Sequence, residues 1–274
     1  MGRKHHVVIV GNGLFGSIAA TLARAHGHEV TVVSNNEPHA ASLASGCVLA
    51  PSWLSSLTTL EVATAMGVLQ ELYTVHPMDF QTNLLKRFKA HRVDPKDVLV
   101  KADAVDTVAS VGDGVVKLAS GDVLRGKVLV AAGVWSDKLV TMPAIRGLWG
   151  ASAVFQGNLE VPRIHVYAPY RQAVAFQMSK NRVWMGDGTA LIESTWSKER
   201  VERQLATIGR GVKLFGLNAD KAKATSGVRP YVEGHKAGYF AQTSRNVWVS
   251  TGGAKNGTVL AAWQAYRFVT EVLR

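Results

Sequence analysis

The hydrophobic pattern at the start of the chain predicts a strand, a helix and a second strand. Residues 6–10, HVVIV, are continuously apolar and β-branched apart from the first position, which is typical of a strand buried on both faces of a parallel sheet. A helix is predicted over 14–26, with Gly27 as its C-terminal cap. The following strand is predicted over 29–33. The chain therefore begins with a predicted βαβ unit.

Beyond this unit the pattern is more mixed. We expect mixed helical structure over 54–90, with an amphipathic helix at 60–73 and a basic segment with apolar spacing at 84–92. The other predicted elements are, in chain order, strands around the turn at 112–114, a buried strand opening into a helix over 127–139, antiparallel strands within 151–192, a charged helix over 197–208, and a strand, a glycine-rich turn and a closing helix over 246–273.

Three glycines at the first turn of the βαβ unit indicate a nucleotide site. Gly11 permits the tight turn, Gly13 lets backbone N–H groups approach a pyrophosphate, and Gly16 lets the helix pack closely on the strand. The helix N-terminus then offers partial positive charge to the phosphates. A glycine turn without a ligand is the alternative, which the βαβ context disfavours.

The second strand lacks the acidic residue that usually follows such a loop. Ser34 and Asn35 stand there instead of a carboxylate that would accept hydrogen bonds from ribose hydroxyls. Both can hydrogen-bond a hydroxyl, but with less energy than a charged acceptor. We therefore expect nucleotide binding to be retained but loosened. A cofactor with a 2′-phosphate would require a nearby arginine, and residues 34–39 contain none.

Composition narrows the class of protein. The 274 residues are 47% hydrophobic, which is enough for a sizeable core. Cys47 is the single cysteine, so an internal disulfide and a cysteine-based metal site are excluded and a reducing cytosol fits best. The nine histidines show no metal-ligand spacing, and no apolar run approaches the ~20 residues of a membrane span. We expect a cytoplasmic protein without a metal or a membrane association.

The net charge of +11 is unevenly placed along the chain. Residues 1–150 carry 14 basic and 12 acidic residues, whereas residues 151–274 carry 17 and 8. A strongly basic half suggests a polyanionic partner such as DNA, and a merely soluble basic surface is the alternative.

Four segments together resemble the FAD-dependent amine oxidases of the D-amino-acid oxidase class, and the glycine oxidases most closely. They are the glycine loop, AASLASGCVLAP (40–51), GDVLRGKVLVAAGVWS (121–136), and the pair SGVRPY (226–231) and TGGAKNGTVLA (251–261). The resemblance implies a Rossmann-like FAD-binding domain interleaved with a small antiparallel-sheet substrate domain. It assigns 1–53, 93–142 and 222–274 to the first domain, and 54–92 and 143–221 to the second.

The resemblance also implies non-covalently bound FAD. The cofactor-binding residues that it indicates are Gly11, Gly13, Leu14, Phe15, Gly16, Ser34, Asn35, Ala44, Ser45, Gly46, Cys47, Val48, Val105, Ala132, Gly133, Trp135, Gly253, Ala254, Lys255, Asn256, Gly257 and Thr258. Cys47 is interpreted as a small packed residue, because no neighbour in the sequence would activate it for covalent flavin attachment.

Two basic residues are the predicted catalytic residues. Arg229, of the Arg-Pro pair, corresponds to the arginine that holds the substrate carboxylate in glycine oxidases; a structural arginine bonded to a backbone carbonyl is the alternative. Lys255 could contact the carboxylate, polarise the flavin or assist oxygen reduction, or be a solvated surface lysine. Tyr167 and Tyr231 are candidates for a tyrosine that also binds the carboxylate.

The chain departs from the family in three places. The stretch between the second and third segments is short, so we expect a trimmed substrate domain and a more open flavin. The acid after the second strand is Ser34, and residues 253–257 lack the family's histidine although Lys255 remains.

These departures leave three functional hypotheses. A compact, basic chain of this type resembles the thymidine glycine oxidases of bacterial viruses, which act on a glycine joined through its nitrogen to a thymine in DNA and release glyoxylate. The first hypothesis is therefore oxidation of a DNA-borne glycine with molecular oxygen as the acceptor, in the host cytoplasm if the chain is viral. The second is oxidation of free glycine, sarcosine or a small D-amino acid. The third is a non-catalytic flavoprotein or DNA-binding module.

Overall fold

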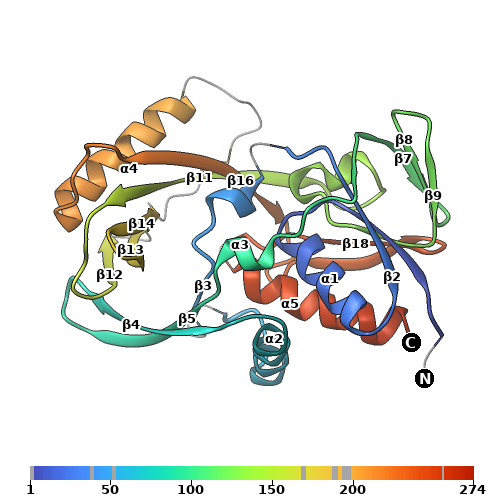
Figure 1. Cartoon of the computed structure of the whole chain (residues 1–274), viewed down its shortest axis with the longest axis horizontal. Helices are drawn as coiled ribbons and strands as arrows, with labels where there is room; N and C mark the ends of the chain where they lie inside the picture. Colours follow the sequence, from blue (N-terminus) through green and yellow to red (C-terminus); the bar gives the residue numbers. More distant parts are fainter. Residues whose placement is uncertain are drawn as a thin grey trace.

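Two large sheets organise the chain in this computed structural model (Figure 1). The structure describes residues 3–37, 40–50, 54–167, 171–186, 191–192, 199–254 and 256–274. A third, small sheet consists of β7 (Val108–Gly112), β8 (Val115–Leu118) and β9 (Val123–Arg125).

The first large sheet contains the N-terminal strand. Its six strands lie in the order β17 (Tyr239–Ser244), β18 (Val247–Thr251), β10 (Lys127–Val130), β1 (His6–Val10), β2 (Glu29–Ser34) and β6 (Ala104–Val105). All neighbours pair in parallel except β17, which pairs antiparallel with β18 at one edge. Because β1, β2, β10 and β18 run in parallel, their carboxyl ends meet at one edge, where ligands bind in such folds.

Apolar side chains cover both faces of this sheet. The helices α1 (Leu14–Ala25) and α5 (Gly257–Arg267) pack on one face, and α2 (Thr59–Leu72) packs on them (Figure 1). The small sheet covers the other face through Val116 and Leu118. The continuous apolar run of β1 is therefore explained, because Val7 to Val10 are buried from both sides. The short helices α3 (Pro95–Val98), η1 (Ala41–Ala44) and η3 (Gly133–Lys138) lie in connections, and the π-helix η4 (Phe268–Val272) extends α5.

The second large sheet is mostly antiparallel. Its nine strands are β15 (Leu191–Ile192), β11 (Ile145–Gln156), β14 (Arg182–Gly186), β13 (Arg171–Ser179), β12 (Arg163–Tyr167), β4 (His76–Thr82), β5 (Arg87–Arg92) and β3 (Val48–Leu49) in that order, with β16 (Lys223–Val232) paired to β11. Its long pair β11–β16 runs toward the first sheet (Figure 1).

Strand register divides the nine-stranded sheet into two faces, since directly paired residues point to the same side. Ala153, Phe155 and Met185 lie on the outer face, which α4 (Glu199–Phe215) covers. Helix and sheet approach so closely that a Cβ at Gly211 would overlap the ring of Phe155. The opposite face, here called the inner face, includes the paired residues Phe176 and Trp184. The two faces therefore carry different sets of side chains, and the outer set packs against α4.

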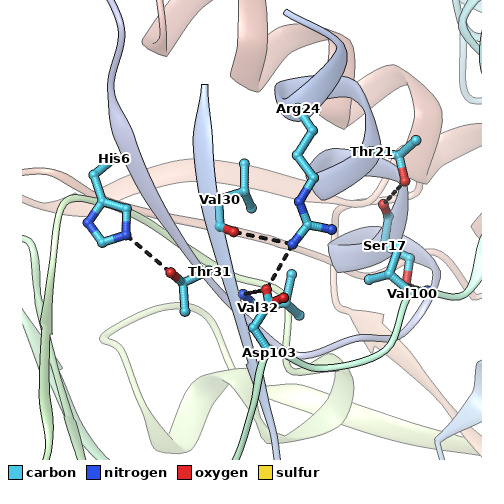
Figure 2. A network of polar contacts seen from close by, with 9 residues as sticks. All are labelled: His6, Ser17, Thr21, Arg24, Val30, Thr31, Val32, Val100 and Asp103. Atoms are coloured by element: carbon cyan, nitrogen blue, oxygen red, sulfur yellow. Dashed lines mark hydrogen bonds and ion pairs between the residues drawn. The ribbon is translucent and has the colours of Figure 1, made fainter. Parts of the chain in front are cut away.

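A polar network fixes the edge of the six-stranded sheet beside α1 (Figure 2). One carboxylate oxygen of Asp103 accepts hydrogen bonds from the Val32 backbone N–H at 2.7 Å and from the Arg24 guanidinium at 2.8 Å. Arg24 also donates to the carbonyl oxygen of Val30 at 3.2 Å. In the same region the Ser17 hydroxyl accepts the Val100 N–H at 3.1 Å. These bonds hold the segment after α3 against α1 and β2.

The fold class predicted from the sequence is confirmed: a parallel sheet with helices and an additional antiparallel sheet are both present. The prediction of mixed helix over 54–90 is correct for α2 but wrong for the rest. Residues 76–82 and 87–92 form the hairpin β4–β5, whose paired Phe80 and Phe88 rings stack at 5.5 Å. Packing between the paired strands therefore determines the secondary structure of this segment. Two strands in segments assigned to the first domain, β3 and β16, pair within the nine-stranded sheet.

Candidate active site

A cavity of about 260 Å³ lies where the carboxyl edge of the six-stranded sheet meets the inner face of the nine-stranded sheet. It brings together sixteen of the residues predicted from the sequence. They are Gly13, Leu14, Phe15, Ala44, Ser45, Gly46, Cys47, Val48, Ala132, Gly133, Trp135, Arg229, Gly253, Ala254, Gly257 and Thr258.

Several lining residues were not predicted. They are Ala40, Ala41, Ser42, Ala131, Gly150, Ala151, Val174, Trp184, Gly186, Gly227, Val228 and Pro230. The first three belong to the quoted segment 40–51, so the sequence did signal their region. Gly150, Val174, Trp184 and Gly186 come from strands that carry no motif, and only the pairing of β11, β13 and β14 brings them here.

The glycine loop has the close contacts that its sequence predicts. Gly11 has a φ of +106°, and a Cβ there would press against the backbone of Ala131. A Cβ at Gly16 would overlap the carbonyl of Gly11, so α1 lies directly on the end of β1. At Gly13, by contrast, the atom nearest to an added Cβ would be the hydroxyl oxygen of Ser42, at 3.0 Å. Gly13 therefore puts no side chain between the N-terminus of α1 and the cavity, apart from its contact with Ser42.

Ser42 acts at the N-terminus of α1. Its hydroxyl oxygen accepts the backbone N–H of Leu14 at 2.9 Å, and its side chain is buried. This bond satisfies one of the N–H groups that have no partner within the helix. It also fixes η1 next to the glycine loop, so the segment 40–51 and the loop form one wall of the cavity.

The residues after β2 form a closed polar cluster. Ser34 donates its hydroxyl proton to Asn12 Oδ1 at 2.8 Å and accepts the Asn36 N–H at 3.0 Å. Asn12 Nδ2 donates to Asn36 Oδ1 at 3.2 Å. Val105 pairs with Ser34 on the edge strand β6 and is 66% exposed.

Among the described residues, the cavity lining does not include every predicted cofactor residue. Those outside it are Gly11, Gly16, Ser34, Asn35, Val105 and Asn256. The two glycines act through backbone packing, as described above, and Ser34 and Val105 stand at the adjacent edge of the sheet.

Cys47 lies on the cavity wall in a strained backbone conformation. Its φ is +45°, its side chain is 2% exposed, and its backbone N–H donates to the Ser45 hydroxyl at 3.1 Å. Burial raises the pKa of the Cys47 thiol above its ordinary value, because the thiolate would lose its hydration. The thiol therefore stays protonated at neutral pH, which disfavours nucleophilic attack on a flavin.

A second helix N-terminus reaches the cavity through the turn before α5. Gly257 and Thr258 begin α5 and line the cavity, so this helix also directs partial positive charge into it. The Ala254 N–H donates to the Pro230 carbonyl at 3.1 Å, which joins the turn to the strand that carries Arg229. Lys255, predicted to act here, lies outside the described residues.

Arg229 projects into the cavity from β16. Its position pairs with Leu148 on β11, and its Nη2 atom lies 3.0 Å from where a Cβ of Gly150 would be. The absence of a side chain at Gly150 therefore provides the space that the guanidinium occupies. A planar guanidinium in a cavity can form two parallel hydrogen bonds to one carboxylate.

The two tyrosine candidates differ from Arg229 in placement. Tyr231 lies on β16 opposite Arg146, and within the described part of the chain it is not among the residues that line the cavity. Tyr167 ends β12, but its side chain lies outside the described residues. The role of either tyrosine stays a prediction.

Trp184 forms an aromatic wall that the sequence did not assign. It lies on the inner face of β14, and its indole stacks on the Phe176 ring with centroids 5.0 Å apart and planes 24° apart. The sequence signal that could have found it is the pair Trp184 and Gly186, which share one face of a strand.

The acidic, histidine and cysteine side chains form no metal centre in the part of the chain that the structure describes. Among those residues, no group of three or more His, Cys, Asp and Glu side chains is placed to hold a metal ion. In the same residue ranges, no helix has the length and apolar character needed to cross a membrane.

Comparison with known proteins shows the fold. No protein-family model matches the sequence, and no curated protein matches it significantly. A solved structure of glycine oxidase from Geobacillus kaustophilus is similar, with 15% identity, a TM-score of 0.71, and coverage of 96% of this chain and 93% of that chain.

Two further solved structures share the architecture. Iminodiacetate oxidase from Chelativorans sp. BNC1 has 14% identity and a TM-score of 0.67, over 95% of this chain and 93% of that chain. Glycerol-3-phosphate dehydrogenase from Bacillus halodurans, complexed with FAD, has 16% identity and a TM-score of 0.67, over 98% of this chain and 64% of that chain. At these identities the similarity establishes the fold alone.

Proposed function

We propose that this protein is an FAD-dependent oxidase that acts on the C–N bond of a glycine unit. One observation carries the proposal: a single cavity joins the N-termini of α1 and α5 to the guanidinium of Arg229. Two helix N-termini suit the anionic parts of a flavin dinucleotide, and the guanidinium suits a substrate carboxylate. Neighbours in fold include a glycine oxidase and an FAD complex, which supports the same assignment.

The residues present fit FAD. Gly13, which has no side chain, would let the pyrophosphate approach the N-terminus of α1, while Gly46 and Cys47 would contact the flavin ring from the segment 40–51. The turn at Gly253 would place a backbone N–H group near the pyrimidine end of the ring, while the Ala254 N–H stays bonded to the Pro230 carbonyl. Cys47 stays a neutral thiol, so the cofactor is held without a covalent bond.

The chemistry places few demands on side chains. When bound, the flavin supplies the two-electron oxidation of the amine. The substrate loses a hydride from its α-carbon and a proton from its nitrogen, which gives an imine; one water then releases the amine and glyoxylate. Molecular oxygen, reduced to hydrogen peroxide, is the proposed final acceptor. Arg229 holds the carboxylate and so fixes the position of the α-carbon.

The decisive experiment measures flavin and product together. Purified protein should be yellow, should release its flavin on acid precipitation, and should form glyoxylate and hydrogen peroxide from glycine or an N-substituted glycine. A protein that cannot be reconstituted with FAD contradicts the proposal. Flavin binding without oxidation of any amine would instead support a non-catalytic flavoprotein.

We further propose that the glycine is carried by a thymine base in DNA. The support is the charge of residues 151–274, where 17 basic residues stand against 8 acidic ones. A free amino acid requires one or two positive groups, whereas phosphates along a DNA strand would use many. Exposed cations in this half include Lys180, Arg182, Lys213, Lys221, Lys223 and Arg245. Free glycine, sarcosine or a small D-amino acid is the alternative substrate, and the same glyoxylate assay on free amines distinguishes them.

A further inference from the structure

Trp184 occupies a position on the cavity wall where two glycines give it room. A Cβ at Gly46 would lie 2.9 Å from Cη2 of the indole, and a Cβ at Gly186 would lie 3.0 Å from Cζ3. A Cβ at Gly186 would also overlap Cη2, so a side chain at either glycine would displace the indole. The six-membered ring therefore lies over Gly186 and against the segment that contacts the proposed flavin.

A stack of buried side chains holds this indole in place. Phe176 covers one face of Trp184, and the Arg92 guanidinium carbon lies 5.1 Å from the Phe176 ring centroid. Arg92 is 6% exposed, and its Nη2 atom donates to Asp94 Oδ2 at 3.2 Å. Each member restricts the next, so Trp184 has little freedom to swing away from the cavity.

The register of the sheet sets the spacing between Trp184 and Arg229. The guanidinium of Arg229 lies beside Gly150, while Gly186, beneath the indole, pairs with Ser152 two residues further along β11. A rise of ~3.4 Å per residue along one strand, and ~4.8 Å to the neighbouring strand, places the two groups roughly 8 Å apart.

That spacing limits what can lie between them. A charge-assisted hydrogen bond from the guanidinium to a carboxylate takes up about 2.8 Å. Van der Waals contact with the indole takes up about 3.5 to 4 Å. What remains beyond the carboxylate oxygen is about 1.5 Å, roughly one covalent bond, so the α-carbon of a bound carboxylate already reaches the indole. A glycine unit meets this limit, and a side chain on its α-carbon exceeds it.

We infer that Trp184 is a specificity-determining residue that restricts the substrate to an amino acid whose α-carbon has no side chain. The inference rests on the proposed function and names its substrate class: glycine and N-substituted glycines, with alanine and larger amino acids excluded. Phe176 and Arg92 act as positioning residues, since they touch the indole or its neighbour and not the substrate.

Binding of unreactive carboxylates tests this without turnover. The probes are acetate, propionate and isobutyrate, whose α-carbons carry no, one and two methyl groups. Their dissociation constants are measured on flavin-loaded protein from the change in flavin absorbance. One added methylene in a fitted pocket changes binding by roughly 10- to 200-fold. We therefore expect wild-type protein to bind acetate at least roughly 10-fold more tightly than isobutyrate.

Two variants at this position sharpen the result. Trp184→Val removes the six-membered ring and keeps a residue suited to a strand, so the ratio of acetate to isobutyrate affinity should fall close to one. The kcat/KM ratio of glycine to D-alanine should fall with it. Trp184→Phe keeps a planar wall and should keep most of the preference. Phe176→Leu loosens the packing on the indole, so both the affinity ratio and the kcat/KM ratio should be intermediate. The kcat/KM ratio should change mainly through KM for D-alanine.

The outcomes separate the inference from the proposed function. If wild-type protein binds isobutyrate as tightly as acetate, or if Trp184→Val leaves the ratio unchanged, Trp184 does not set the size limit, while the oxidase assignment stands. If Trp184→Val weakens all three probes equally, the indole is a general binding surface and the inference is wrong. If flavin-loaded wild-type protein binds no carboxylate and oxidises no amine, the proposed function fails first.

Discussion

The hydroxyl of Ser34 donates a hydrogen bond to Asn12 Oδ1 at 2.8 Å, and this bond closes a neutral cluster where related nucleotide sites have a carboxylate. Asn36 completes the cluster through its backbone N–H and its side-chain oxygen. The donor of Ser34 and one of its lone pairs are thus already used within the protein. Ribose hydroxyls could still form hydrogen bonds here, because neutral acceptors remain, although these acceptors are weaker than a carboxylate. A nucleotide site can therefore persist without the acid.

Replacing Ser34 with aspartate should tighten FAD binding. A carboxylate accepts hydrogen bonds roughly twice as strong as those to a neutral oxygen. We expect the dissociation constant for FAD to fall about 5- to 10-fold, equivalent to ~1 kcal/mol, measured by quenching of flavin fluorescence. Ser34→Asn, which adds no charge, is the matched control and should give little gain. Equal effects of the two variants would show that the ribose does not reach this position.

The glycine loop allows packing and binding to be separated. Gly13→Ala would meet the Ser42 hydroxyl at 3.0 Å and little else, whereas Gly16→Ala would overlap the Gly11 carbonyl. We expect Gly13→Ala to weaken FAD binding while the FAD-free protein loses less thermal stability than Gly16→Ala, because only the Ser42 hydroxyl must shift. Gly16→Ala should also lower the free energy of unfolding, by about 1 to 3 kcal/mol for overpacking. If Gly13→Ala bound FAD normally, the pyrophosphate would lie elsewhere.

Arg229→Lys keeps the positive charge but loses the planar pair of donors. The loss of a bidentate charged contact is worth ~2 to 4 kcal/mol, or roughly 30- to 1000-fold in kcat/KM for the amine. Flavin absorbance should be unchanged, which separates a lost substrate contact from a lost cofactor. Normal turnover by Arg229→Ala with intact flavin would assign the arginine a structural role.

The buried thiol of Cys47 should make the free energy of unfolding depend on pH in the alkaline range. Burial raises the pKa of the Cys47 thiol in the folded protein above the ordinary value of 9.0. Below pH 9.0 the thiol is therefore protonated in the folded and the unfolded protein, and its contribution to the free energy of unfolding is fully present. Above that pH the unfolded chain ionises first, and the unfolding free energy should fall by at most about 1.4 kcal/mol per pH unit.

Denaturant titrations of wild-type protein and Cys47→Ala between pH 8 and 11 should show that the variant lacks this slope. Burial also raises the pKa of Tyr73, so Tyr73→Phe serves to identify the second alkaline contribution. Rapid modification of Cys47 by a thiol reagent in folded protein at pH 8 would contradict the burial on which this prediction depends.

Some elements of the fold are determined by local sequence, and others by pairing between strands. The βαβ unit was predictable because its glycine spacing and apolar runs lie within 30 residues, and Gly16 packs on Gly11 within the unit, although the contact of Gly11 with Ala131 is not local. The hairpin β4–β5 was not, because its apolar positions fit a helix, whereas pairing between the strands, with Phe80 stacked on Phe88, favours the sheet. Composition and local spacing do not distinguish a helix from a hairpin in such a segment.

The substrate end of the site shows the same division. Arg229 was found through its Arg-Pro motif, whereas Trp184 stands in a strand without one. The two reach one cavity because β16 and β14 flank the same strand, β11. A register shift by one residue would turn either side chain to the outer face, and the sequence alone does not state that register.

Two exposed basic side chains near the cavity are placed to contact DNA phosphates. Arg182 and Lys223 are exposed on the inner face, where Lys223 pairs with the same β11 residue as Trp184 and Arg182 lies two residues beyond it. Helix α4, with its own basic residues, covers the outer face. DNA that delivers a base-borne glycine to the cavity would therefore place phosphates against Arg182 and Lys223. The double variant Arg182→Glu and Lys223→Glu should weaken DNA binding far more than Lys117→Glu with Arg125→Glu, which makes the same change of charge at exposed positions of the small sheet.

Salt dependence provides the quantitative form of this prediction. If about four phosphates are neutralised, affinity for DNA should fall ~100-fold between 50 and 200 mM salt, while oxidation of free glycine should barely respond. The inner-face variant should reduce the slope of log affinity against log salt by about two, one for each lost contact, and the control variant should not. Binding is measured on single-stranded and duplex DNA, alongside glyoxylate release from glycine-modified DNA. Absence of DNA binding at low salt, together with efficient oxidation of free glycine, would assign the protein to free amino acids, since the basic half would then have no phosphates to hold.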